Sequence, residues 1–369
     1  MPIDLSTALG AELPSQSFSW TASDVALYSL GVGAAADPMD VRGLGYVDDA
    51  APKVLPSFAT VAATMNVTEA PRVSFPGVEI DLAKVVHGSQ YVELHQPIPA
   101  AASATTRTRI AEIQDKGSAA VIIQESTTTD DSGQTLWTAR SGIFAKGEGG
   151  FGGERGRSEK VEYPDREPDH TVEVRSLPQQ ALLYRLCGDR NPLHSDPAFA
   201  EAAGFPRPIL HGLCSYGMVL RAVVDEVLGG DVERVRSYGV TFGGVFFPGE
   251  TMRVRVWRDG ERLLVSATAV ERDDAPVLKN VVVGLAGPAP GHTPLPHTLP
   301  LRTGPREPSL RRSCTTHHRP RDQRVHGGGG AQRERVRSGR RGAVQKTSVC
   351  EGGVRPSGSG PRPRGSSPR

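Results

Sequence analysis

The chain has 369 residues, enough for two domains with hydrophobic cores, and its formal net charge is +2. This average hides a division, because residues 288–369 hold 16 arginines and one lysine against four acids, which gives +13 and leaves −11 for residues 1–287. No apolar run approaches the roughly 18 residues that a membrane span needs, and the first residues resemble no secretory signal. None of the four cysteines forms a CxxC pair, so we expect a reduced, cytoplasmic protein rather than a disulfide scaffold or a zinc ribbon.

The first 287 residues divide into two similar halves. A charged, turn-rich segment at 157–170 predicts a surface linker between residues 1–156 and 171–287. Three short strings recur across it in the same order: Tyr28-Ser-Leu-Gly31 as Tyr184-Arg-Leu-Cys187, Val54-Leu-Pro56 as Ile209-Leu-His211, and Val92-Glu-Leu94 as Val240-Thr-Phe242. Offsets of 156, 155 and 148 residues indicate a duplicated fold.

The predicted elements follow a common order in each half. Short helices are expected at 22–30 and 178–186, and a long apolar helix at 211–228, ended by Gly229-Gly230. Alternating apolar residues predict strands at 91–94, 105–113, 119–125 and 134–144, and then at 253–257, 263–270 and 277–285, with a hairpin turn at Asp259-Gly260. Antiparallel strands around one long helix predict an α+β fold, a double hot dog of two antiparallel sheets wrapped round central helices.

The first half has a weaker counterpart of the long helix. The matching segment, 54–65, is shorter and contains Pro56, so we expect its helix to be incomplete.

Chemistry concentrates between Tyr184 and Gly212. Asp189, Asn191 and His194 share one turn-rich loop, where an acid, an amide and an imidazole could hold one water molecule for general acid–base catalysis. Gly212 opens the apolar helix, whose free N–H groups suit a developing oxyanion. An aspartate in such a loop is more often a turn residue, and His211 equally fits a structural role, so spacing alone leaves both interpretations open.

The same segment resembles the hydratase-2 motif of the MaoC-like dehydratase family. That motif reads Y-x-L-x-G-D-x-N-P-L-H-x-D-P and then F-x-x-P-I-L-H-G, and every fixed position is present between Tyr184 and Gly212. Shorter strings resemble the two-domain eukaryotic-type (3R)-hydratases: YSLGVG at 28–33, VLPSF at 54–58, FGG at 151–153 and FPGET at 247–251. The resemblance covers about 18–285.

The resemblance implies a reaction and roles for single residues. Asp189 and His194 would be the acid–base pair, Asn191 would orient the water, and the Gly212 N–H would bind the thioester oxygen. The implied reaction is reversible syn addition of water to a trans-2-enoyl-CoA, giving a (3R)-3-hydroxyacyl-CoA, with no metal or other cofactor. Substrate contacts are expected at Phe58, Met65, Arg207 and His211. We expect the protein to form a homodimer. Its binding partner is expected to be the acyl-CoA substrate.

The first half departs from the motif. Val32-Gly33-Ala34-Ala35 stands where the second half has Gly188-Asp189-Arg190-Asn191, and Pro56 replaces His211. We therefore expect residues 1–156 to be non-catalytic and residues 171–287 to be the catalytic MaoC-like domain. Family members use the space of the broken helix for a long or bulky acyl chain, which would make residues 54–66 its surroundings. Ordinary core packing accounts for Phe58 and Met65 equally well.

Three other functions compete with this interpretation. A (3R)-hydroxyacyl-carrier-protein dehydratase has the same chemistry, but a core of −11 would repel an acidic carrier protein. A hot-dog thioesterase shares the architecture, but the GDxNPxH loop argues against this function. Nucleic-acid binding would depend on the basic tail.

The composition of residues 288–369 points away from a nucleic-acid partner. Arg, Pro, Gly and Ser dominate and no Phe, Tyr or Trp occurs, so we expect the tail to be disordered. GC-rich DNA read in a shifted frame gives this composition, and we expect a frameshift after about residue 290. Cys314 with His317-His318 supplies too few ligands for a zinc site.

Overall fold

The computed structural model describes residues 3–287 except 66, 71–73, 81–83 and 157–159. The predicted disordered tail and part of the predicted linker lie outside the described residues. No helix in the described part of the chain is long and apolar enough to cross a membrane.

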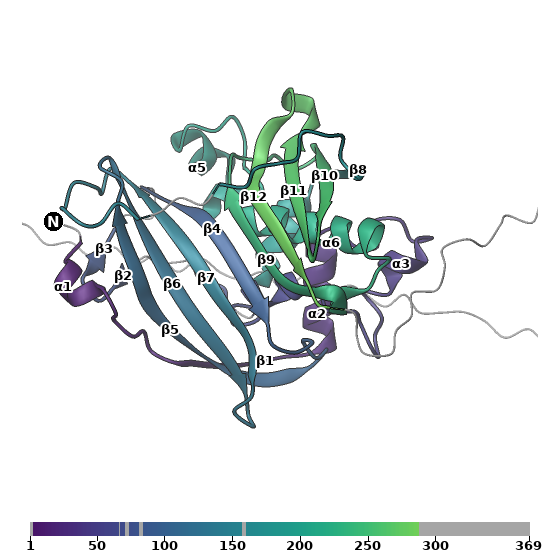
Figure 1. The fold of residues 1–369 in the computed structure, drawn as a ribbon, viewed down its shortest axis with the longest axis horizontal. Helices are drawn as coiled ribbons and strands as arrows, with labels where there is room; N and C mark the ends of the chain where they lie inside the picture. The colour runs from purple at the N-terminus through teal and green to yellow at the C-terminus, as the bar shows by residue number, and fades with distance from the viewer. Residues whose placement is uncertain (1–2, 66, 71–73, 81–83, 157–159, 288–369) are drawn as a thin grey trace, which may run out of the picture. The chain divides into compact units, whose positions relative to one another are not determined.

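A ten-stranded antiparallel sheet is the main element of the fold (Figure 1). Its strand order is β1-β5-β6-β7-β4-β9-β12-β11-β10-β8. The first half supplies β1 (Gln16–Trp20), β4 (Val85–Leu94), β5 (Ala102–Asp115), β6 (Ala119–Asp130) and β7 (Thr135–Lys146). The second half supplies β8 (His170–Arg175), β9 (Val235–Phe242), β10 (Thr251–Asp259), β11 (Arg262–Ala269) and β12 (Ala275–Leu285). A separate small hairpin joins β2 (Ser74–Phe75) to β3 (Val78–Glu79).

The halves meet at β4 and β9. These strands pair antiparallel from Ser89↔Thr241 to Glu93↔Ser237, with Tyr91 opposite Gly239. The two predicted sheets are therefore continuous, because pairing these strands satisfies main-chain groups that two separate sheets would leave at exposed edges. The alternation did not predict β1, β8 or β9. The first two are short edge strands with few apolar residues.

The long helix α6 (Gly212–Val227) lies against this sheet and is enclosed by both halves. Twelve of its 16 residues are buried, as its apolar sequence predicted, and its bounds agree with the prediction to within one residue at each end. The predicted hairpin is also present, since Asp259 pairs with Arg262 around Gly260, whose φ of +61° suits glycine.

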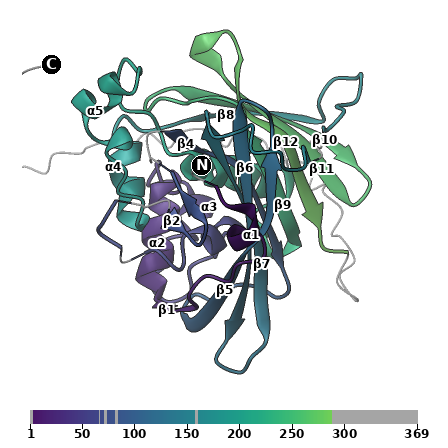
Figure 2. The same ribbon diagram turned by 90° about the vertical axis from the view of Figure 1, so that its left-hand side faces the viewer.

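Two short helical segments pack on each other (Figure 2). They are α2 (Ala22–Gly31) and α4 (Gln180–Tyr184), the latter continued by the 3₁₀ helix η3 (Arg185–Cys187). The Tyr28 and Tyr184 rings lie 6.2 Å apart, and a side chain on Gly31 would lie 3.5 Å from the Cys187 sulfur. The residues that echo each other in the sequence are thus in contact across the boundary of the halves.

The counterpart of α6 in the first half forms no α-helix, which confirms the prediction that the helix at 54–65 is incomplete. Only a 3₁₀ helix, η1 (Pro56–Thr60), forms there, followed by turns through Met65. Phe58 is fully buried, with its ring 6.0 Å from that of Trp20 and 5.6 Å from that of Tyr28. Aromatic side chains therefore occupy part of the volume that a full helix would fill.

The remaining helical segments are short. They are α1 (Leu5–Ala8), α3 (Val41–Leu44), η4 (Pro192–His194), α5 (Pro197–Ala202), η5 (Val232–Arg234) and η6 (Val270–Arg272).

Candidate active site

The loop between η3 and α5 is fixed by local hydrogen bonds. Gly188 has a φ of +108°, and a side chain there would overlap the Thr64 carbonyl of the other half. The Asn191 N–H donates to Asp189 Oδ1 over 3.1 Å, and the Leu193 N–H donates to Asn191 Oδ1 over 3.0 Å, which caps η4. The Asn191 side-chain oxygen is therefore occupied, and its amide nitrogen is the group that can face a ligand.

Three ionisable side chains converge at this loop. The ligand atoms of Asp189, His194 and His211 all lie within 4.8 Å of one another. The two imidazole rings stack with centroids 3.7 Å apart, and both are buried. The structure thus brings the predicted acid and imidazole together and places His211, expected to contact substrate, directly beside them.

Main-chain carbonyls orient both rings. His194 Nδ1 lies 2.9 Å from the Ile209 oxygen, and His211 Nε2 lies 3.2 Å from the Asp189 oxygen. Because a carbonyl only accepts, these nitrogens carry the protons, which leaves His194 Nε2 and His211 Nδ1 as acceptors. His211 Nδ1 is buried and finds no partner among the described residues.

Burial keeps both imidazoles neutral. It lowers the pKa of His194, while the charge of Asp189 and the bond to Ile209 act in the opposite direction. Burial also lowers the pKa of His211 well below its usual value, and the neighbouring His194 adds to this. A neutral His194 beside a carboxyl group is suited to accept a proton at Nε2.

Gly212 places a helix N-terminus at the same site. It is the first residue of α6, where N–H groups lack partners within the helix. A side chain at this position would lie 3.0 Å from the Phe242 ring, so any larger residue would require that ring to shift. The main-chain N–H groups here can bind an oxygen that gains negative charge.

His87, on β4 of the first half, belongs to the same surroundings and was not predicted. Its ring centroid lies 4.9 Å from that of Phe242, and its Nε2 lies 3.0 Å from Ser141 Oγ. Burial lowers the pKa of His87 to about 4, against the opposing effect of the Asp189 charge. The predicted strand at 91–94 did not include it, whereas β4 begins at Val85 and pairs His87 with Ile143 of β7.

The other predicted substrate contacts lie elsewhere. Phe58 and Met65 are buried in the hydrophobic core. Arg207 is exposed, with its guanidinium 4.9 Å from the Phe247 ring and Nη1 donating to the Pro248 oxygen over 3.3 Å.

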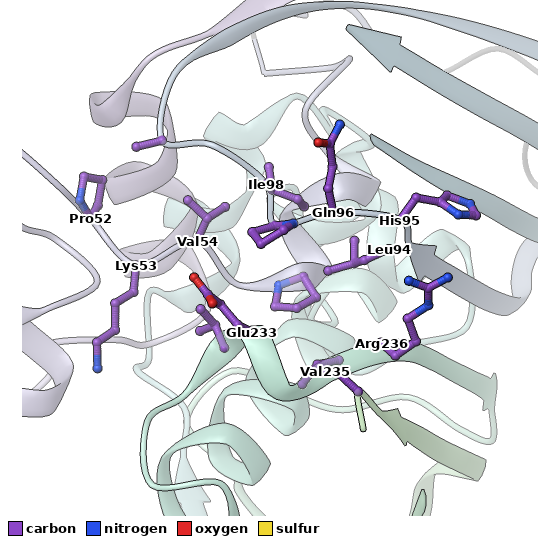
Figure 3. A pocket seen from close by; sticks show the side chains of 15 residues that line it. Pro52, Lys53, Val54, Leu94, His95, Gln96, Ile98, Glu233, Val235 and Arg236 are labelled. Atoms are coloured by element: carbon purple, nitrogen blue, oxygen red, sulfur yellow. The ribbon is translucent and has the colours of Figure 1, made fainter. Parts of the chain in front are cut away.

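A cavity of about 380 Å³ borders the start of η1 (Figure 3). Val54 and Pro56 line it, whereas Phe58 and Met65 do not.

The cluster also contains donors that a divalent cation could use. They are the Asp189 carboxylate, His194 Nε2 and His211 Nδ1. Main-chain carbonyls orient both rings without the help of an ion.

Two family models match this chain. Residues 18–147 match the model of the MFE-2 hydratase 2 N-terminal domain, and residues 159–276 match that of the MaoC like domain. The chain is 57% identical to enoyl-CoA hydratase ChsH3 of Mycobacterium tuberculosis, over 76% of this chain and 98% of that protein. It is 37% identical to the peroxisomal enoyl-CoA hydratase 2 of Arabidopsis thaliana, over 72% of this chain and 90% of that protein.

A solved structure has the same architecture. The MaoC-like dehydratase from Phytophthora capsici superimposes with a TM-score of 0.71 at 29% identity, covering 79% of this chain and all of that one. From the double hot-dog fold, the GDxNPxH loop and these relatives, the chain belongs to the two-domain MaoC-like hydratase 2 family.

Proposed function

We propose that the protein catalyses reversible hydration of trans-2-enoyl-CoA to (3R)-3-hydroxyacyl-CoA. The observation that carries the proposal is the convergence of Asp189 and His194 within one buried cluster beside the N-terminus of α6. Two of the relatives are named enoyl-CoA hydratases, which supports the same chemistry.

The geometry suggests how water is added. A water molecule held between Asp189 and His194 Nε2, and oriented by the Asn191 amide, gives its oxygen to Cβ of the enoyl group. One of its protons passes to the acid–base pair, which delivers a proton to Cα. Both groups belong to one loop and reach the substrate from one face, so the addition is syn. Asp189 and His194 act as a coupled pair in these two transfers.

The thioester oxygen gains enolate character during this reaction. We assign its binding to the Gly212 N–H at the start of α6, where a donor and the helix dipole both face the developing charge. One such preorganised donor typically lowers a barrier by about 3–4 kcal/mol.

The two halves have different roles in this proposal. Residues 171–287 carry the catalytic groups, residues 157–170 link the halves, and residues 1–156 accommodate the acyl chain near the segment 54–65. Phe58 and Met65 would have to move aside to border that chain, because both are packed in the core. Arg207, exposed and close in sequence to the catalytic cluster, is available for the CoA part.

The proposal also includes fatty-acyl metabolism in the cytoplasm and a homodimer. Cys187 and Cys214 are free and buried, which suits a reducing compartment. Light scattering of the purified chain tests the dimer.

A coupled assay tests the function directly. Crotonyl-, decenoyl- and steroidal enoyl-CoAs would be supplied with the full chain, and the configuration of the hydroxyacyl product determined. A (3R) product is expected. A (3S) product, or release of free CoA thiol as a thioesterase would give, contradicts the proposal.

A further inference from the structure

The two ends of α6 are related by the duplication. Tyr91 and Gly239, which face each other in the β4–β9 ladder, are 148 residues apart, the same offset as Val92 and Val240. With this offset His87 corresponds to Val235, and Phe242 corresponds to Leu94. The offset of 155 makes Pro56 the counterpart of His211, and Val54 that of Ile209.

All four counterparts line one cavity. Val54, Pro56, Leu94 and Val235 border the cavity of about 380 Å³ shown in Figure 3. It lies beyond the C-terminal end of α6, since Val232 and Glu233 also line it, whereas the catalytic cluster lies at the N-terminal end. A helix of 16 residues is about 24 Å long, so the two sites are separate. The cavity occupies the place in the first half that the active site occupies in the second.

The walls of this cavity favour an apolar ligand. Beside the four counterparts, Ile98 and Ala100 line it. His95 and Glu233 also border it, at positions whose counterparts are Gly243 and Val85 and not the acid–base pair. Its volume falls in the range of about 300–1,000 Å³ that small-molecule sites occupy.

The rim carries charges that the catalytic end lacks. Lys53, Glu233 and Arg236 border the cavity, and their counterparts by the same offsets are Pro208, Val85 and Gly88. In Figure 3 the ends of Lys53 and Arg236 lie on opposite sides of the apolar lining. At these aligned positions the other half has no charged residue.

Lys53 makes the rim suited to an anion. It is half-buried, its amine donates to the Gly230 oxygen over 3.1 Å, and it lies 5.7 Å from the Tyr46 ring centroid. It has no carboxylate partner within the described residues, whereas Arg236 reaches Glu93 over 3.4 Å. A half-buried cation without a counter-ion favours a ligand that supplies one.

We propose that this cavity is a second, non-catalytic binding site for an amphipathic carboxylate, with the apolar chain against Val54, Leu94 and Ile98 and the carboxylate toward Lys53. The site goes beyond the proposed hydration: it shares Val54 and Pro56 with the segment proposed for the acyl chain, but it lies at the opposite end of α6 from the acid–base groups.

Calorimetric titration of decanoate into the full chain tests the site. The active site would be kept occupied by (3R)-3-hydroxybutyryl-CoA. We expect one equivalent of decanoate to bind, and decanol, which lacks the charge, to bind at least about tenfold more weakly. Absence of saturable decanoate binding, or equal affinity for decanol, would overturn the proposal.

Two variants and one matched control locate the ligand. Ala100→Trp fills the cavity, and Lys53→Gln removes the cation while keeping most of the side chain, so each should weaken decanoate at least about tenfold. Ala63→Phe crowds the segment proposed for the acyl substrate and should leave decanoate affinity unchanged. Should Ala100→Trp not fold, as judged by thermal melting, Lys53→Gln decides alone. Unchanged affinity in Lys53→Gln, or a loss only in Ala63→Phe, contradicts this site and leaves the hydration assay unaffected.

Discussion

The two ends of α6 are surrounded by elements that correspond to each other through the duplication. They differ in a few of the residues that line the site at each end. One end presents His87, Phe242 and His211, with two imidazoles stacked beside Asp189. The other presents Val235, Leu94 and Pro56 at the corresponding positions of a cavity wall. A duplicated scaffold therefore supplies two concave places, and the side chains at corresponding positions decide which of them can transfer protons.

The non-catalytic half still supports the catalytic loop. The segment that starts with Pro56 at the cavity ends near Thr64, whose Oγ1 donates to the Cys187 oxygen over 3.2 Å. Arg190 donates from its Nε to the Val67 oxygen over 3.4 Å on the other side of the loop. Loss of the first half would thus remove contacts that hold Gly188 and Asp189 in position.

The largest effect on the hydration rate is expected from substitutions of the acid–base pair. Asp189→Asn and His194→Ala should each lower the hydration rate at least about a hundredfold, because each removes one member of the acid–base pair. Steady-state assays with crotonyl-CoA would measure this. Asp231→Asn, an exposed capping residue at the opposite end of α6, is the matched control and should retain the rate. Near-normal activity of either catalytic variant would remove the assignment.

The second prediction tests the packing at the start of α6. Gly212→Ala places a methyl group 3.0 Å from the Phe242 ring and should lower kcat about tenfold to a hundredfold, since small displacements at a reacting centre are costly. Adding Phe242→Leu, which copies Leu94 of the other half, should recover part of the loss. A double variant no better than Gly212→Ala would show that the ring is not the obstacle.

A third prediction concerns the space left by the incomplete helix. Ala59→Phe or Ala63→Phe should impair decenoyl-CoA more than crotonyl-CoA, by about 1–3 kcal/mol of overpacking or roughly 5- to 150-fold in kcat/KM. Both substrates are measured on the same folded variant, so that general destabilisation cancels. An equal loss for both substrates would argue against a role of this segment in chain selection.

The fourth prediction uses the buried imidazoles of the catalytic end. Burial lowers the pKa of His87, His194 and His211, whereas an unfolded histidine has a pKa of about 6.5. Below that pH the unfolded chain binds more protons than the folded chain. The free energy of unfolding should therefore fall as the pH is lowered from about 6.5 towards 4, by up to about 1.4 kcal/mol per pH unit for each imidazole.

Urea unfolding at several pH values measures this slope. His87→Gln should reduce it, because one depressed pKa is removed. An unchanged slope in that variant would mean that folding does not lower the pKa of His87.

The smallest effect is expected from removing residues 291–369. Their composition offers no aromatic or continuous apolar surface for a core, so the shortened chain should keep its activity and melting temperature. Side-by-side assays of the two chains check this. A large loss of folding or turnover would show that the tail contributes to the working protein.

Local sequence determined several parts of this protein. The apolar run from Gly212 to Val227 predicts α6 because it is buried on nearly all sides, and Asp259-Gly260 predicts its hairpin because a positive φ is needed there. Pro56 predicts the incomplete helix because proline cannot donate within one. The spacing of Asp189, Asn191 and His194 in one short loop predicts their proximity.

Only the tertiary structure decided the rest. Pairing of β4 with β9 joins the two sheets and carries His87, 102 residues before Asp189 in the chain, to the catalytic end. The stacking of His194 on His211, the burial of Phe58 among aromatic rings and the cavity at the opposite end of α6 depend on contacts of the same long range. Local patterns report which face of an element is buried, but they do not specify which distant residue covers it.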